Sequence, residues 1–182
     1  MIVPFTYASL PVTPWKNGGG ETREVARIPH PRAPFLWRCS LATLQADGPF
    51  SRFEGIDRTL VLLEGADFWL RGGGVSHHLR RGEPWAFPGE LPLASEGIAG
   101  PGLDFNIMTL RGAAQARVLN TAAAYRPGSE GVAWVSAGRW RMAGDAFTPA
   151  SGIWWQGECP GELEPLAGGG ALIVAEIARI AG

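Results

Sequence analysis

Apolar and polar residues alternate along much of the chain, in short segments that end at glycine or proline. A repeat of two residues is typical of a β-strand with one buried face, and the repeat expected of an amphipathic helix is scarce. A single helix is predicted near Ala113–Tyr125. The alternation predicts strands over Thr22–Ile28, Leu36–Leu44, Arg58–Leu63, Asp67–Arg71, Val75–Arg80, Leu103–Leu110, Val132–Ser136, Arg139–Ala143, Ile153–Gln156 and Ala171–Arg179. We therefore expect an all-β sandwich or barrel.

One stretch has a more specific order of strands and turns. Between Leu60 and Gly89, short strands are separated by tight glycine and proline turns, in an order that resembles half of a cupin jelly roll. The region from Val132 onward repeats this order more faintly. The sequence thus predicts a bicupin of two cupin-like jelly-roll units packed as one compact protein. Residues 1–112 form the unit that carries the motifs, and residues 113–182 form the second, which we interpret as a scaffold.

Composition and charge exclude several classes of protein. Hydrophobic residues make up 46% of the 182 residues, enough for a substantial core. With 16 basic and 17 acidic residues, the net charge is −1, so no positive field favours nucleic acid or a membrane surface. Met1–Pro14 lacks the basic start and apolar run of a signal peptide, so we expect a cytoplasmic location. Cys39 and Cys159 are accordingly expected as reduced thiols.

The histidines argue against a metal centre. Metal-binding cupins present two histidines one residue apart, whereas this chain has His30, His77 and His78. Adjacent residues of a strand point to opposite faces, so His77 and His78 cannot share one metal ion without a bulge. We therefore predict no metal and no cofactor.

The most distinctive local motif is Pro14–Glu24, PWKNGGGETRE. Consecutive glycines allow backbone amides to approach another surface, and amides beside Lys16 suit an anionic oxygen. A turn between two strands is the alternative interpretation of the same glycines. Strand alternation places Glu24 on one face with Ala26 and Ile28; if that face is buried, the carboxylate needs a partner such as Arg38 or Arg58.

Further polar residues interrupt otherwise apolar strands. Arg38 and Ser40 share one strand face, and Asp104 and Asn106 share a face of another. Arginine binds a carboxylate through two parallel hydrogen bonds, so Arg38 and Arg58 are candidate anion ligands. Polar groups at these positions either face solvent or line a polar cavity, and the pattern alone leaves both open.

Together these segments resemble the HutD/Ves family, closely over residues 1 to about 112 and weakly beyond. The motifs that carry the resemblance are Pro14–Glu24, Trp37–Ser40, Asp47–Ser51, Gly55–Arg58, Leu62–Gly65 and Asp104–Met108. The resemblance implies a metal-free bicupin associated with histidine utilisation in bacteria, with a pocket for a small carboxylate metabolite. It implies pocket residues Lys16, Asn17, Arg38, Arg58, Asp104 and Asn106, supported by Trp15, Glu24, Ser40 and Glu64. Cys39 departs from the family's usual small or apolar residue, but it belongs to the opposite strand face.

Three functions follow as alternatives. We favour a regulatory protein that binds a carboxylate such as urocanate or N-formylglutamate, and we assign no catalytic residue. The second is a metal-free cupin enzyme, an isomerase, epimerase or hydrolase, with Glu24, Glu64 and Asp104 as its proton carriers. The third is an oligomeric interaction or stress-response protein of the Ves type. Trp154-Trp155 places one ring on each strand face, and an exposed ring would suit a homodimer interface.

Overall fold

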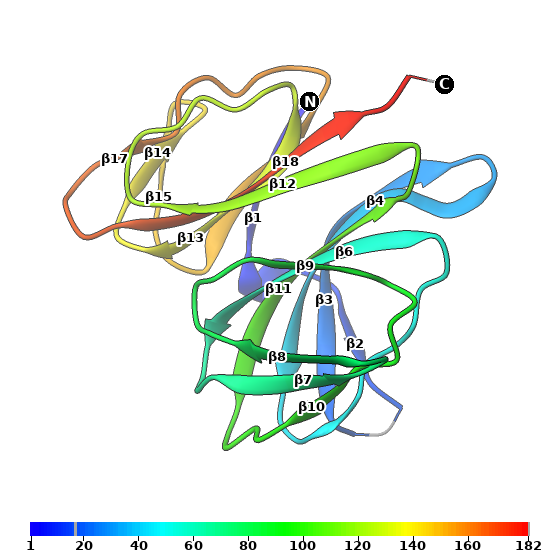
Figure 1. Cartoon of the computed structure of the whole chain (residues 1–182). Coiled ribbons are helices and arrows are strands. Elements are labelled where there is room, and N and C mark those ends of the chain that lie inside the picture. Colours follow the sequence, from blue (N-terminus) through cyan, green and yellow to red (C-terminus); the bar gives the residue numbers. More distant parts are fainter. Residues whose placement is uncertain (17, 182) are drawn as a thin grey trace. The chain divides into compact units, whose positions relative to one another are not determined.

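The computed structural model describes residues 1–16 and 18–181, whose regular secondary structure is almost wholly β-strand (Figure 1). They form two compact units. The N-terminal unit comprises Pro11–Ala114, and the C-terminal unit comprises Met1–Leu10 together with Gln115–Ile180. The one helical segment of the described residues is a short 3-10 turn, Tyr7–Ser9. In this part of the chain, no helix is long and apolar enough to cross a membrane.

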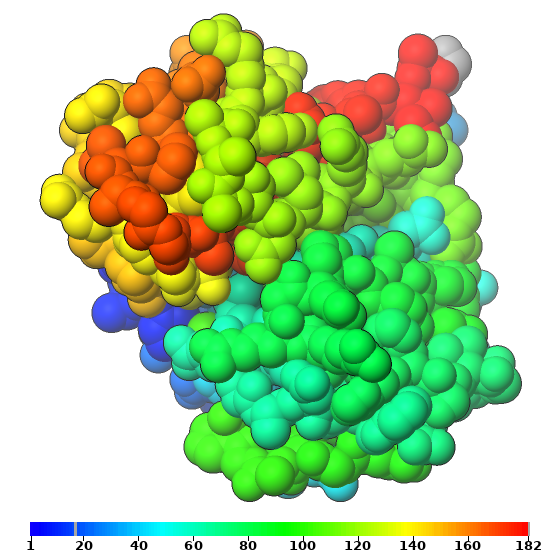
Figure 2. All heavy atoms as spheres, turned by 60° about the vertical axis from the view of Figure 1, so that its left-hand side comes forward, coloured from blue at the N-terminus to red at the C-terminus, as the bar shows by residue number. Residues whose placement is uncertain are grey.

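Two sheets of antiparallel strand pairs form the N-terminal unit. The larger sheet has the order β2-β3-β4-β11-β6-β9, and the smaller has the order β5-β10-β7-β8. Strands distant in sequence are neighbours in both sheets, as in a jelly roll. Figure 2 shows the green segment that contains β7, β8 and β10 as one outer face of this unit. The strands are β2 Val12–Pro14, β3 Gly20–His30, β4 Ala33–Leu44, β5 Gly48–Pro49, β6 Ile56–Glu64, β7 Phe68–Gly72, β8 Val75–Leu79, β9 Trp85–Pro88, β10 Ala94–Glu96 and β11 Gly102–Leu110.

Apolar side chains of both sheets form a core cluster in the N-terminal unit. Leu60 and Leu62 of β6 pack with Phe68 and Leu70 of β7 and with Leu79 of β8. Each such side chain contributes about 1.5–3 kcal/mol by leaving water. The cluster holds the smaller sheet against the inward face of the larger one, where polar residues occupy the neighbouring positions.

The C-terminal unit has a five-stranded and a three-stranded sheet, ordered β1-β16-β13-β18-β12 and β15-β14-β17. Two fully buried indoles, Trp140 and Trp155, lie in its core cluster with nearby aliphatic side chains. Figure 2 shows yellow and orange segments, which carry β14, β15 and β17, over one side of this unit. Its strands are β1 Ile2–Thr6, β12 Ala114–Thr121, β13 Glu130–Ala137, β14 Trp140–Met142, β15 Asp145–Phe147, β16 Ser151–Gln156, β17 Glu164–Pro165 and β18 Ala171–Arg179.

The predicted all-β class is confirmed, and every predicted strand has a counterpart. The helix predicted over Ala113–Tyr125 is wrong, because most of that segment is strand β12. Its alanines have a high helix propensity, but the chain gains more by pairing with β18 at the edge of the five-stranded sheet. Cys39 and Cys159 are free thiols, as predicted.

The division between the units differs from the expected 1–112 and 113–182. The boundary between the N-terminal unit and the following residues lies after Ala114, two positions from the expected one. However, Met1–Leu10 belong to the C-terminal unit, because β1 pairs with β16, with Ile2 opposite Trp155 and Thr6 opposite Ser151. The N-terminal unit therefore begins at Pro11.

Candidate ligand-binding site

A pocket of about 480 Å³ lies in the N-terminal unit. Pockets for small molecules commonly span about 300–1,000 Å³. Its residues come from β2, the β2–β3 turn, β3, β4, β5, the segment that follows β5, β6 and β11. They are Thr13, Pro14, Trp15, Lys16, Thr22, Arg38, Ser40, Ala42, Pro49, Phe50, Ser51, Phe53, Arg58, Asp104, Asn106 and Met108. All of these described residues belong to the N-terminal unit.

The register of β4, β11 and β6 gathers polar side chains on the inward face of the larger sheet. Alternate residues of a strand share a face, and directly opposite residues of neighbouring strands share it too. Three successive cross-strand rows share this face: Arg38–Met108–Arg58, Ser40–Asn106–Leu60 and Ala42–Asp104–Leu62. The strand order thus brings together residues that lie up to 70 positions apart in sequence.

A β-bulge between Glu24 and Ala26 corrects the predicted faces of β3. Glu24 is opposite Ser40, but Ala26 is opposite Cys39 and Arg27 is opposite Arg38. Glu24 consequently shares a face with Arg27. Simple alternation predicts instead that it shares a face with Ala26 and Ile28, and this prediction is wrong. The extra residue of a bulge reverses the alternation beyond it.

Glu24 accepts hydrogen bonds from two arginines. Arg38 Nε donates to Glu24 Oε1 at 2.9 Å, and Arg27 Nε donates to the same oxygen at 3.0 Å. Partial burial raises the pKa of the Glu24 carboxyl, but the two arginines outweigh burial and hold that pKa below its usual range. Glu24 does not line the pocket; it supports Arg38, which does.

Arg58 is enclosed by aromatic rings. Its guanidinium carbon lies 5.8 Å from the Phe50 centroid, 5.2 Å from that of Phe53 and 5.1 Å from that of Phe87. Its Nη1 donates to the Ser51 carbonyl at 3.1 Å. Burial lowers the pKa of Arg58 to about 10, with Arg38 acting in the same direction and Asp104 against it. The group therefore stays cationic at neutral pH.

Three buried polar atoms at the site have no hydrogen-bond partner among the described residues: Arg58 Nε, Asp104 Oδ1 and Asn106 Oδ1. All three residues are at most 6% exposed. Burial raises the pKa of Asp104 to about 7, against the opposing charge of Arg58. An unpaired buried polar group costs about 1–3 kcal/mol, so this cluster favours a ligand that supplies the missing hydrogen bonds.

The glycine motif forms the turn between β2 and β3. Trp15 N donates to the Gly20 carbonyl, and Gly18, at φ 71°, donates its N–H to the Trp15 carbonyl. The turn interpretation therefore holds for Gly18, whose amide bonds within the turn and not to an anion. Trp15 Nε1 donates to Thr22 Oγ1 at 2.8 Å, which fixes the indole against the pocket. The exposed Lys16 also lines the pocket.

The structure brings most of the predicted site residues together. Asn17 lies outside the described residues. Glu64 is exposed at the end of β6 and does not line the pocket, because the Glu64-Gly65 turn carries it away. Seven predicted residues do line it: Trp15, Lys16, Arg38, Ser40, Arg58, Asp104 and Asn106.

Several lining residues were missed by the sequence analysis. Thr22 and Met108 could have been predicted, because each lies two residues along its strand from a candidate residue, Glu24 or Asn106, and so shares its face. The aromatic wall formed by Phe50 and Phe53 comes from a segment without strand structure, so no periodicity indicated it.

The histidines lie away from this pocket. His77 stacks on Trp85 at 4.2 Å and His78 on Trp69 at 4.6 Å, on opposite faces of edge strand β8. Across residues 1–16 and 18–181, no group of three or more His, Cys, Asp or Glu side chains is arranged to hold a metal ion.

Two antiparallel β units, with a charged pocket in the N-terminal one, give the protein a cupin-like β fold. The structure of a cupin 2 conserved barrel domain protein from Leptotrichia buccalis matches with a TM-score of 0.59 and 10% identity, over 97% of this chain and 96% of that one. HutD from Pseudomonas fluorescens SBW25, solved in a formate condition, matches with a TM-score of 0.88 and 24% identity over 100% of both chains.

The particular family follows from the sequence comparisons. The family model described as HutD matches residues 7–165. Protein Ves of Cronobacter sakazakii is 37% identical over 177 residues, which cover 95% of this chain and 97% of that protein. The chain therefore belongs to the HutD family, and the predicted resemblance to HutD and Ves is confirmed.

Proposed function

We propose that the N-terminal unit binds a small carboxylate metabolite without a metal ion, and that the protein acts in the cytoplasm as a regulatory component of histidine utilisation. Urocanate and N-formylglutamate are the ligands to test first. The observation that carries this proposal is the unpartnered Arg58 Nε beside the unpartnered oxygens of Asp104 and Asn106 in one pocket.

Each part of the pocket has a role in this proposal. Arg58 donates from its Nε side, because Nη1 is already bonded to Ser51. Arg38 donates from its terminal nitrogens, because its Nε is bonded to Glu24. Lys16 adds a positive charge at the exposed part of the lining. Asp104 and Asn106 bond the nitrogen-bearing end of the ligand.

Thermal unfolding with a panel of histidine-pathway metabolites tests the proposal, since a ligand that binds the folded state raises its melting temperature. Calorimetry then compares Arg58→Gln with Arg71→Gln. Arg71 is a matched control, because its guanidinium also packs on an aromatic ring, Trp69 at 4.5 Å, but it does not line the pocket. Loss of a buried charge partner costs about 3–5 kcal/mol, so Arg58→Gln weakens binding at least about a hundredfold. Equal affinity in both variants would refute the assignment.

The raised pKa of Asp104 favours a second candidate function, a metal-free enzyme. A carboxyl group with a pKa of about 7 is suited to proton transfer at neutral pH. Of the proton carriers predicted from the sequence, Glu24 is held by two arginines and Glu64 is exposed, so Asp104 stands alone in the pocket. General acid–base chemistry usually needs an acid and a base that face each other, and we therefore favour binding. Steady conversion of urocanate followed by NMR, and lost in Asp104→Asn, would favour the enzyme.

A further inference from the structure

The aromatic enclosure of Arg58 is built from two separate segments. Phe87 belongs to β9, whereas Phe50, Phe53 and the Ser51 carbonyl belong to residues 50–55, which have no strand structure. We call residues 50–55 the cage loop. The attraction between a guanidinium and an aromatic ring depends on the position of the cation over the ring. The three rings can therefore surround Arg58 only if the cage loop is held next to the end of β9.

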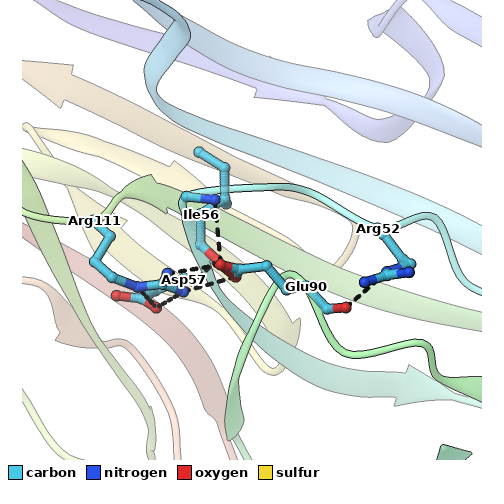
Figure 3. Close-up of polar contacts among 6 residues, drawn as sticks. Arg52, Ile56, Asp57, Glu90 and Arg111 are labelled. Atoms are coloured by element: carbon cyan, nitrogen blue, oxygen red, sulfur yellow. Dashed lines mark hydrogen bonds and ion pairs between the residues drawn. The ribbon is translucent and has the colours of Figure 1, made fainter. Parts of the chain in front are cut away.

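Glu90, two residues after β9, makes that connection (Figure 3). Its Oε2 accepts a hydrogen bond from Gly55 N at 3.3 Å, and its carbonyl accepts one from Arg52 Nε at 2.8 Å. In Figure 3, Arg52 and Arg111 approach Glu90 from opposite sides. One residue therefore fastens the cage loop at two points.

Arg111 holds the Glu90 carboxylate in place. Its Nη1 and Nη2 donate to the two carboxylate oxygens at 2.8 Å and 2.9 Å, and its Nε donates to Asp57 Oδ1 at 2.9 Å. The bonds from Arg111 lower the pKa of Glu90 to about 2, so its carboxylate is ionised throughout the neutral range. A bidentate pair fixes direction as well as distance.

Backbone hydrogen bonds at Gly89 also join the cage loop to the segment that follows β9. Phe53 N donates to the Gly89 carbonyl at 2.7 Å, and Gly89 N donates to the Ile56 carbonyl at 2.7 Å. A Cβ at Gly89 would lie 2.6 Å from the Phe53 carbonyl oxygen. The cage loop thus docks on Gly89 and Glu90 through its backbone, which leaves its phenyl rings directed at Arg58.

From these contacts we propose that Glu90 is a positioning residue of the ligand site. Glu90 does not itself line the pocket, but it holds the cage loop next to β9 and so orients the Arg58 guanidinium that receives the anion. The expected effect of Glu90 on urocanate affinity rests on the proposed function. Its expected effect on the orientation of Arg58 does not depend on that function. A preorganised anion ligand avoids the cost of ordering a loop at the moment of binding.

The test compares Glu90→Gln with Glu96→Gln. Glu96 is a matched control, because it is a surface carboxylate on β10 whose ion pair, at 3.0 Å, is with Arg71 of the neighbouring strand β7 and not with a residue of the cage loop. The first readout is the Nε–H resonance of Arg58 in arginine-labelled protein, identified by its absence in Arg58→Lys. We expect ring currents of the three phenyl groups to displace this resonance in the parent protein, because the Arg58 guanidinium carbon lies 5.1–5.8 Å from their centroids. The second readout is urocanate affinity by calorimetry.

We expect Glu90→Gln to move the Arg58 resonance toward its solvent-exposed position and to weaken urocanate binding about tenfold, whereas Glu96→Gln changes neither. An unchanged resonance in folded Glu90→Gln overturns the proposal. A moved resonance in a protein that never binds urocanate supports the positioning role and counts against the proposed ligand. If Glu90→Gln does not fold, the proposal is tested with Arg52→Ala. This variant removes the hydrogen bond from Arg52 to the Glu90 carbonyl and keeps the Glu90–Arg111 pair. An Arg58 resonance at the parent position in Arg52→Ala then overturns the proposal.

Discussion

Asp104 and Arg58 influence each other across the pocket without forming an ion pair in the described part of the chain. Arg58 is opposite Met108, whereas Asp104 is opposite Leu62, four residues further along β6. Each charge favours the ionised form of the other group, but burial outweighs both effects: the pKa of Asp104 is raised and that of Arg58 is lowered. Near neutral pH, Asp104 is partly protonated while Arg58 keeps its charge. The pocket is therefore cationic and suited to an anion.

The raised pKa of Asp104 predicts a definite pH dependence of stability. Between about pH 4 and pH 7 the folded protein retains a proton that the unfolded chain has lost, so the free energy of unfolding falls as the pH rises. The total loss is of the order of 4 kcal/mol, because one pKa unit corresponds to about 1.36 kcal/mol. Above pH 7 this contribution no longer changes. Denaturant unfolding at several pH values measures it.

Asp104→Asn provides the comparison for this prediction, because the amide cannot ionise. The lowered pKa of His77, which results mainly from burial, acts in the opposite direction, but it contributes to both proteins and cancels in the difference. The stability of the variant relative to the parent is expected to increase from pH 4 to pH 7. Parallel pH profiles of the two proteins would show that Asp104 is ionised normally.

The unpartnered amide of Asn106 predicts a conflict between stability and binding. Asn106→Leu removes a buried oxygen that lacks a hydrogen bond, and is expected to raise the free energy of unfolding by about 1–2 kcal/mol while weakening urocanate binding. Ser95→Ala is the opposite case, since Ser95 Oγ accepts from Gly48 N and donates to the Gly48 carbonyl. We expect Ser95→Ala to lower the free energy of unfolding by about 1 kcal/mol and to leave urocanate binding unchanged. Unfolding and calorimetry of both variants check this, and a destabilised Asn106→Leu would argue that the amide is already satisfied.

The strands could be predicted from alternation because the two-residue period is a local property, whereas the pocket residues came from the resemblance to the HutD/Ves family, since alternation alone left their role open. Arg38, Ser40, Asp104 and Asn106 fall on the correct face once their strands are recognised. The bulge after Glu24 was not predicted, because strict alternation was assumed across Val25 and Ala26, two adjacent apolar residues that are both buried. The aromatic enclosure of Arg58 was equally hidden, because the cage loop has no periodicity and its position depends on contacts with Glu90.

The two units also differ in a way that their similar strand patterns do not indicate. The core of the C-terminal unit is occupied by Trp140 and Trp155, both fully buried. In the N-terminal unit, the inward face of the larger sheet carries arginines, an aspartate and an asparagine that line a pocket. The scaffold role of the C-terminal unit stays a prediction.

The last prediction concerns Gly20, where the glycine motif meets β4. A Cβ at this position would lie 2.1 Å from the Thr43 carbonyl oxygen and 3.3 Å from Cε3 of Trp15. The oxygen belongs to the backbone of a paired strand and cannot move alone, so Gly20→Ala must displace β3 from β4 or push the Trp15 indole away. We expect a loss of about 1–3 kcal/mol in the free energy of unfolding, together with weaker urocanate binding, because the displaced indole lines the pocket. Gly48→Ala separates this effect from the general consequences of adding a methyl group, since a Cβ there meets nothing within 4 Å. Unfolding curves and calorimetry of the two variants should therefore diverge, and a Gly20→Ala protein as stable as Gly48→Ala would show that the strands of this hairpin are not so closely paired.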